Sequence, residues 1–260
     1  MKIVVCVKQV LDPRGVTVNR KAEKVFVNRE EYVLDPASRA ALQVAAAVKQ
    51  ELMAANGATP PQIVAISLGP DRVDDALREA MAFGADRAIH LKDAAFDAAD
   101  AFVTANALAA AIRKVEAVDL VLLGAHSLDS GAGEMAGRLA EALDWPQASN
   151  AVSVEAKPGV VRIVRPWGES FARVTMSYPA VVAVMSEAFA ADHPSGWRLM
   201  DAYKQWTVEA WSAADLGLGE EELRPAAARK EDAFPPERQP GTQVKDVKEL
   251  AAVLKRERLI

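Results

Sequence analysis

The segment Leu120–Met135 combines an apolar run with a turn made mostly of small residues. Leu120–Ala125 is apolar, Gly131 and Gly133 follow shortly after, and a helix-like stretch comes next. Glycines allow a backbone to approach a ligand closely, and the free N–H groups at a helix start attract anions. We expect Asp129 or Ser130 to cap this helix. These residue types are typical of a phosphate-binding turn.

The same residues also fit a tight strand–helix turn that binds nothing. The segment "DSGAGEMAG" has neither the lysine of a P-loop nor a complete G-x-G-x-x-G pattern. Glu134 would oppose a phosphate if it pointed toward it. Residue chemistry alone therefore leaves both interpretations open.

Other candidates for chemistry are few. His90, His126 and His193 are dispersed without metal-ligand spacing, and we expect each to be structural or solvent-facing, with no metal site. Cys6 lies within an apolar run, which predicts a buried, inert thiol. No Ser-His-Asp arrangement or carboxylate pair is apparent. A group of aromatic residues could form either a partner surface or a small satellite core: Trp197, Tyr203, Trp206 and Trp211.

Composition narrows the class of protein. The chain has 260 residues, a net charge of −5 and a pI near 5.4, so nothing favours nucleic acid as a partner. A single cysteine fits a reducing compartment. No apolar run reaches the roughly 20 residues that span a bilayer, so we expect no membrane insertion. We expect a cytoplasmic location in a bacterium, or the mitochondrial matrix in a eukaryote.

Short apolar runs alternate with helix-like stretches through the first half of the chain. The runs 2–7, 62–69, 87–91 and 120–125 are continuously apolar, which is typical of parallel strands covered on both faces. Pro36 near one helix start and Gly84 near another helix end support the helices between them. The order predicts an α/β fold with a doubly wound, mostly parallel sheet of the flavodoxin-like, adenine nucleotide-binding type.

The remainder of the chain changes character. Residues 151–185 read as strands joined by turns at Pro158–Gly159 and Trp167–Gly168, a β-hairpin region. We expect one domain over 1–190, a variable partner-recognition segment over 191–232, and a C-terminal arm over 233–260. The proline- and charge-rich stretch 226–243 predicts extended chain. The arm ends in an amphipathic helix that would dock on this chain or on a partner.

Several motifs recur in one order along nearly the whole chain. They are "VCVKQVLD", "YVLDPASRAALQVA", "IVAISLGPDRVDDALREAMAFGADRAIHL", "DLVLLGAHSLD", "LDWPQ", "YPAVVAV", "DLGL" and "VKELAAVLKRERLI". Together they resemble the β subunits of electron transfer flavoproteins. The resemblance implies a heterodimer whose α subunit carries a redox-active FAD and is wrapped by the C-terminal arm. The heterodimer would take electrons from a flavin dehydrogenase and pass them to a quinone reductase or another acceptor. This subunit would have no catalytic residues of its own.

The resemblance also implies a structural AMP in this subunit. The positions that match the family's AMP contacts are Cys6, Asp35, Pro36, Ala37, Ser38, Leu68, Gly124, Ala125, His126, Ser127, Leu128, Asp129, Ser130, Gly131, Ala132, Gly133, Glu134 and Met135. Electron-bifurcating members bind a second FAD there and typically show "DGDTAQVGP" in the loop. The loop "DSGAGEMAG" differs, which favours AMP over a second FAD.

Three departures from the family pattern mark a divergent member. Asp35 stands where an Asn is common, and the phosphate loop has fewer hydroxyl and amide side chains. The region of partner recognition also differs, and the candidate residues for it are Ala188, Phe189 and Trp197. Two alternatives stay open: an independent adenine-nucleotide enzyme or sensor on the same fold, and a scaffold with a vacant pocket.

Overall fold

A computed structural model describes residues 1–56, 60–189, 193–227, 233–236, 238 and 240–260. The described chain divides into two units, Met1–Thr17 with Phe26–Ala228, and Val18–Val25 with Arg229–Ile260. Part of the extended segment expected over 226–243 lies outside the described residues. Among the helices that the structure describes, none is long and apolar enough to cross a membrane.

The larger unit is built on a seven-stranded sheet in the order β14-β7-β6-β1-β8-β13-β9, and every strand pair in it is parallel. Its strands are β1 (Lys2–Cys6), β6 (Gln62–Leu68), β7 (Arg87–Leu91), β8 (Leu120–Gly124), β9 (Gln147–Ala151), β13 (Ala180–Val184) and β14 (Val208–Trp211). The apolar runs predicted as strands are β1, β6, β7 and β8. Apolar side chains on both faces of these strands explain why the sheet lies at the centre of the unit.

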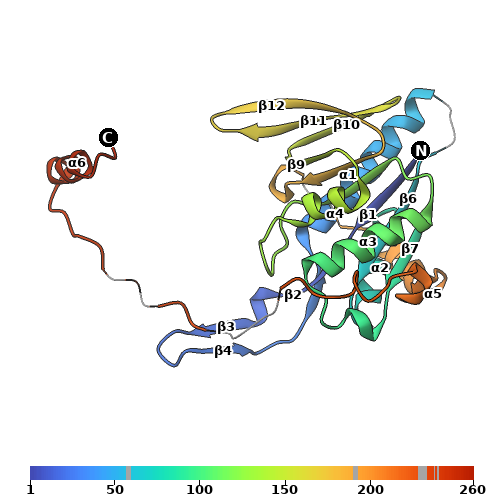
Figure 1. The fold of residues 1–260 in the computed structure, drawn as a ribbon, viewed down its shortest axis with the longest axis horizontal. Coiled ribbons are helices and arrows are strands. Elements are labelled where there is room, and N and C mark those ends of the chain that lie inside the picture. Colours follow the sequence, from blue (N-terminus) through green and yellow to red (C-terminus); the bar gives the residue numbers. More distant parts are fainter. Residues whose placement is uncertain (57–59, 190–192, 228–232, 237, 239) are drawn as a thin grey trace. The chain divides into compact units, whose positions relative to one another are not determined.

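Helices cover both faces of this sheet (Figure 1). They are α1 (Pro36–Asn56), α2 (Val73–Phe83), α3 (Ala101–Val115) and α4 (Met135–Leu143). Successive residues of β1 enter opposite cores, since Ile3 packs with residues of α1 and α2 whereas Val4 packs with residues of α3 and α4. The predicted doubly wound α/β fold is therefore confirmed.

The strands predicted over 151–185 divide between two sheets. β10 (Ser153–Lys157), β11 (Val160–Trp167) and β12 (Ser170–Ser177) form an antiparallel sheet, with turns at the two expected places. β13, in contrast, joins the central sheet as a parallel strand between β8 and β9, and β9 lies almost entirely before the predicted range. The sequence pattern missed this division, because an apolar run does not reveal which strand will become its neighbour.

Shorter elements complete the described chain. β2 (Gln9–Leu11) pairs with β5 (Tyr32–Leu34), and β3 (Val16–Asn19) pairs with β4 (Lys24–Val27). Single 3₁₀ turns occur at Pro13–Gly15, Ala94–Phe96, Ser186–Ala188 and Ala214–Leu216, and α5 spans Gly196–Lys204.

The predicted terminal helix is α6 (Val247–Arg256), which belongs to the smaller unit. The carboxylate of Asp246 accepts a hydrogen bond from the N–H of Glu249, a standard helix start. Every residue of α6 is half-buried or exposed, including the apolar Val247 and Leu250. Within the described part of the smaller unit, no residue of α6 is therefore fully buried.

Candidate functional site

A cavity of about 470 Å³ lies beyond the carboxyl ends of β1, β6 and β8. Ligand sites of small-molecule size generally have about 300–1,000 Å³. The cavity is lined by Cys6, Val7, Lys8, Asp35, Ser38, Leu68, Ala99, Ala101, Thr104, Leu108, Leu123, Gly124, Ala125, His126, Ser127, Ser130, Ala132, Gly133, Glu134 and Met135. In open parallel sheets this edge is where ligands bind.

Asp35 connects the start of α1 to the loop after β8. Its Oδ2 accepts hydrogen bonds from the N–H groups of Ala37 (3.1 Å) and Ser38 (3.3 Å), which makes it the N-cap of α1. Its Oδ1 accepts the N–H of Leu128 at 2.9 Å. A single buried carboxylate therefore fixes both the helix and the loop.

The environment of Asp35 also affects its ionisation. Burial raises the pKa of this carboxyl above its ordinary value, because desolvation outweighs the three N–H donors, and the neighbouring charge of Asp129 acts in the same direction. The carboxylate thus combines useful hydrogen bonds with an unfavourable buried charge.

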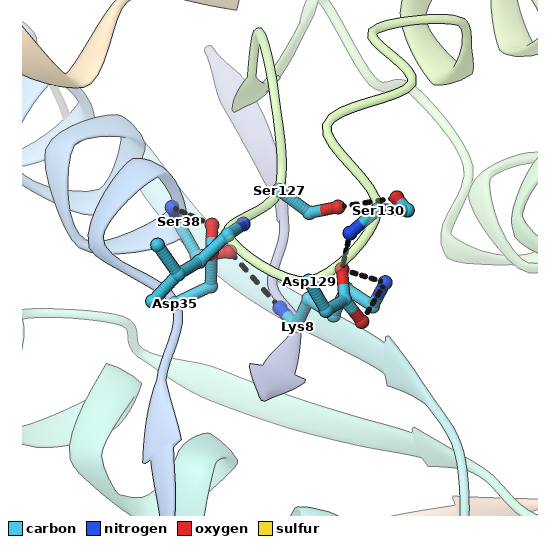
Figure 2. A network of polar contacts seen from close by, with 7 residues as sticks. Lys8, Asp35, Ser38, Ser127, Asp129 and Ser130 are labelled. Carbon is cyan, nitrogen blue, oxygen red and sulfur yellow. Dashed lines mark hydrogen bonds and ion pairs between the residues drawn. The ribbon is translucent and has the colours of Figure 1, made fainter. Parts of the chain in front are cut away.

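Lys8 connects the end of β1 to the same loop (Figure 2). Its Nζ lies 2.6 Å from Oδ2 of Asp129. Asp129 also accepts the N–H of Ser130 at 2.7 Å, and the hydroxyls of Ser127 and Ser130 lie 2.8 Å apart. Burial disfavours the Asp129 carboxylate, but the hydrogen bonds from Lys8 and Ser127 outweigh it, so its pKa lies below the ordinary value.

The start of α4 faces this cavity without a side-chain cap. The expectation that Asp129 or Ser130 caps the helix is wrong, because α4 begins only at Met135 and Glu134 occupies the N-cap position. Within the described residues, no side chain caps that first turn. Glu134 instead pairs with Arg138 at 2.8 Å, one turn along the helix. The backbone N–H groups at this helix start can therefore serve an anion.

Two glycines allow the close packing around the cavity. A Cβ on Gly124 would lie 2.4 Å from the Cβ of Ala37, so β8 can end against α1 only with glycine there. Gly133 has φ +67°, and a Cβ on it would lie 2.6 Å from the His126 ring. The loop conformation therefore depends on these two positions.

The structure brings most of the expected AMP positions together around one cavity. Cys6, Ser38, Leu68 and the greater part of 124–135 line it. The expected positions outside the lining are Pro36, Ala37, Leu128, Asp129 and Gly131. Asp129 and the N–H of Leu128 contribute indirectly, through Lys8 and Asp35.

Sequence reasoning missed several lining residues. Lys8 lies two residues after the end of β1, in the region where a parallel sheet presents functional side chains, and this signal could have identified it. Ala101, Thr104 and Leu108 of α3 also line the cavity. Their i, i+3 and i+7 spacing puts them on one helix face, but only the packing of α3 shows that this face meets the cavity.

The remaining candidates occupy separate environments. Cys6 is buried, and burial raises the pKa of its thiol to about 12, which disfavours a nucleophilic thiolate. His90 is buried between the Asp74 carboxylate and the Gly69 carbonyl, at 2.8 Å from each. His126 contacts the Gly131 carbonyl, and His193 lies in the segment before α5. No group of three His, Cys, Asp or Glu in the described ranges is arranged to hold a metal.

The candidate partner-recognition residues and the aromatic residues do not form one cluster. Ala188 ends a 3₁₀ turn, Phe189 packs against the core on the α1 side of the sheet, and Trp197 on α5 is 75% exposed. Trp206 packs on the same core as Phe189, whereas Trp211 packs on the opposite one.

A doubly wound sheet with a cavity at its carboxyl edge, bounded by a glycine-containing strand–helix loop, defines the class: an α/β protein with a cavity at the edge of the sheet where such folds bind ligands. The family model described as the electron transfer flavoprotein domain matches residues 23–216. The chain therefore belongs to the electron transfer flavoprotein family, and its relatives place it with the β subunits.

Three relatives illustrate this placement. The chain is 31% identical over 223 residues to the caffeyl-CoA reductase-Etf complex subunit CarD of Acetobacterium woodii, covering 85% of this chain and 82% of that one. It is 30% identical over 229 residues to the β subunit from Mycobacterium tuberculosis, covering 85% and 82%. Against the Bos taurus β subunit the identity is 29% over 262 residues, covering 98% and 97%. The predicted resemblance is confirmed.

Proposed function

We propose that this chain is the β subunit of a heterodimeric electron transfer flavoprotein and binds AMP in the cavity beside β1, β6 and β8. An α subunit would hold the redox FAD. The heterodimer would accept electrons from a flavin dehydrogenase and deliver them to a quinone reductase or another acceptor. Family membership and the near full-length match to named β subunits support this assignment.

The observation that carries the AMP site is the uncapped start of α4 at the cavity. A phosphate there would accept hydrogen bonds from the free N–H groups at the start of α4. The positive end of the helix dipole lies at the same place and would also favour the anion. Leu68, Leu108 and Met135 line the same cavity and would give apolar contacts to a base or ribose. Cavity size, apolar walls and the helix start therefore fit a nucleoside monophosphate.

AMP has no redox chemistry, so its contribution would be structural. A bound phosphate would satisfy the start of α4, and a nucleotide lying across the cavity would join the ends of β1, β6 and β8. Ligand that binds only the folded protein stabilises it by mass action. In this proposal the chain supplies a scaffold and partner surface, and the electrons travel through the flavin of the α subunit.

The test is the cofactor content of the complex. The chain is co-expressed with its α subunit, the purified heterodimer is denatured, and released FAD and AMP are quantified by chromatography. Equimolar FAD and AMP would support the proposal. FAD at twice the heterodimer concentration would indicate a second FAD in this subunit. FAD without AMP would refute the nucleotide site, and failure to form a complex would refute the heterodimer.

A control separates this function from an independent enzyme on the same fold. The purified chain and the heterodimer are both incubated with ATP and Mg²⁺, and released phosphate is measured. The proposal expects no turnover. Turnover by the chain alone would indicate an adenine-nucleotide enzyme instead.

A further inference from the structure

The charges around the cavity are unevenly matched to a phosphate ligand. Among the described residues that line it, Lys8 is the sole Lys or Arg, whereas Asp35 and Glu134 are carboxylates. A phosphate monoester carries more than one negative charge near neutral pH. The helix start offers N–H groups and a partial charge only. A phosphate in this cavity would therefore need the Lys8 ammonium as its counter-charge.

The main chain of Lys8 is fixed at the cavity. Its N–H donates to Oγ of Ser38 at 3.0 Å, and its carbonyl accepts the N–H of Asp35 at 2.9 Å. Ser38 and Asp35 are themselves buried at the start of α1. The Lys8 side chain thus begins from a rigid point and has only its own flexible stem to adjust.

The ammonium group of Lys8, in contrast, is held only by a weak ion pair. It pairs with Asp129, and the two side chains are 47% and 42% exposed. Half-exposed ion pairs of this kind contribute little, because water and salt screen them. Asp129 does not line the cavity, but Lys8 does. Exchanging Asp129 for a ligand phosphate would therefore cost little and move the charge toward the cavity.

We infer that Lys8 is the phosphate-binding cation of this site and that it exchanges its ion pair with Asp129 for one with the ligand phosphate. Asp129 is then a competitor for Lys8, which weakens phosphate binding while the site is free. The ligand class is a nucleoside monophosphate, and the inference rests on the nucleotide site proposed above. It assigns a binding role to a residue outside the AMP positions that the family resemblance implies.

The first test compares ligands with and without a phosphate. Lys8→Met is introduced into the complete heterodimer, nucleotide is removed, and binding of AMP and of adenosine is measured by calorimetry. We expect AMP affinity to fall on the order of tenfold and adenosine affinity to change little, since a charge-assisted contact is lost. Lys92→Met is the matched control, because Lys92 forms a similar ion pair with Asp71 away from the cavity.

The second test removes the competitor. Asp129→Asn keeps an oxygen for the N–H of Ser130 but gives up the negative charge. We expect tighter AMP binding and unchanged adenosine binding, because Lys8 no longer has to leave Asp129. If Asp129→Asn and Lys8→Met both weaken AMP and adenosine equally, the ion pair shapes the loop and Lys8 does not bind phosphate.

The nucleotide site and the role of Lys8 can be refuted separately. If the unmodified heterodimer binds neither AMP nor adenosine, the proposed nucleotide site is wrong and the role of Lys8 falls with it. If the unmodified heterodimer binds AMP and Lys8→Met binds it equally well, only the assignment of Lys8 is wrong. Restored AMP affinity in Lys8→Arg would support the assignment further, because it returns the charge.

Discussion

Replacing Asp35 should loosen the cavity loop as well as the helix that Asp35 begins. In Asp35→Ala, the N–H groups of Ala37 and Ser38 lose their cap, which typically costs about 1 kcal/mol. The N–H of Leu128 loses its only side-chain acceptor in the described structure, at a further cost of about 1 kcal/mol, since that group is partly buried. We expect the free energy of unfolding to fall by about 2 kcal/mol. Both substitutions remove the buried charge, but Asp35→Asn should cost less than Asp35→Ala because Asn keeps one oxygen acceptor.

Amide hydrogen exchange separates the two contributions. A loss of about 1 kcal/mol at the loop corresponds to roughly fivefold faster local opening of residues 124–135. Mass spectrometry of peptides from the heterodimer would measure it, together with denaturant unfolding at fixed protein concentration. Ser195→Ala is the matched control, because Ser195 caps α5 through the N–H of Arg198 and does not contact the loop. It should reduce stability without changing exchange in 124–135.

The refuting result is specific. If Asp35→Ala lowers stability by about the cost of a helix cap and leaves exchange of 124–135 unchanged, Asp35 is a cap only. Its bond to the N–H of Leu128 would then contribute nothing to the loop conformation.

Two further predictions follow from local geometry and ionisation. Gly124→Ala should lower the melting temperature and the retention of nucleotide, because the new Cβ would lie 2.4 Å from the Cβ of Ala37. Gly137→Ala is the control: it lies on exposed helix surface with nothing within 4 Å of the new Cβ, and it should raise the melting temperature. Equal effects of the two substitutions would contradict the close approach at Gly124. Desolvation raises the pKa values of Tyr178 and Tyr203 to about 12, and for the half-exposed Tyr203 the hydrogen bond to the Asp75 carboxylate adds to this shift. An unfolded tyrosine titrates near 10. The neutral phenols therefore stabilise the fold below about pH 10, and this contribution is lost as the pH rises from there through 12. Tyrosinate absorbance during an alkaline titration should appear late in the native protein and near pH 10 in denaturant.

Local patterns were sufficient for most of the secondary structure. The continuous apolar runs became strands because each is covered on both faces, and Pro36 and Gly84 stand at a helix start and a helix end as their backbone preferences require. The burial of Cys6 also followed from its place in such a run. These features depend on residues close together in the chain, so composition and spacing reveal them.

Local patterns did not predict how the loop after β8 is held or where α4 begins. The helix cap expected at Asp129 or Ser130 is wrong, because the chain continues to residue 135 before α4 begins. Asp129 instead forms an ion pair with Lys8, which is 121 residues away in the sequence. A polar residue near a helix start has several partners available, and only tertiary packing selects one.

The sequence alone determined the order of strands and helices, the α/β class and the edge of the sheet where a ligand site belongs, because periodicity and turn residues act locally. The tertiary structure alone decided that β13 lies between β8 and β9, that Asp35 holds the N–H of Leu128, and that Lys8 reaches Asp129. Each of these joins segments far apart in the chain. Such contacts are set by which apolar surfaces pack together, and a linear pattern does not contain that information.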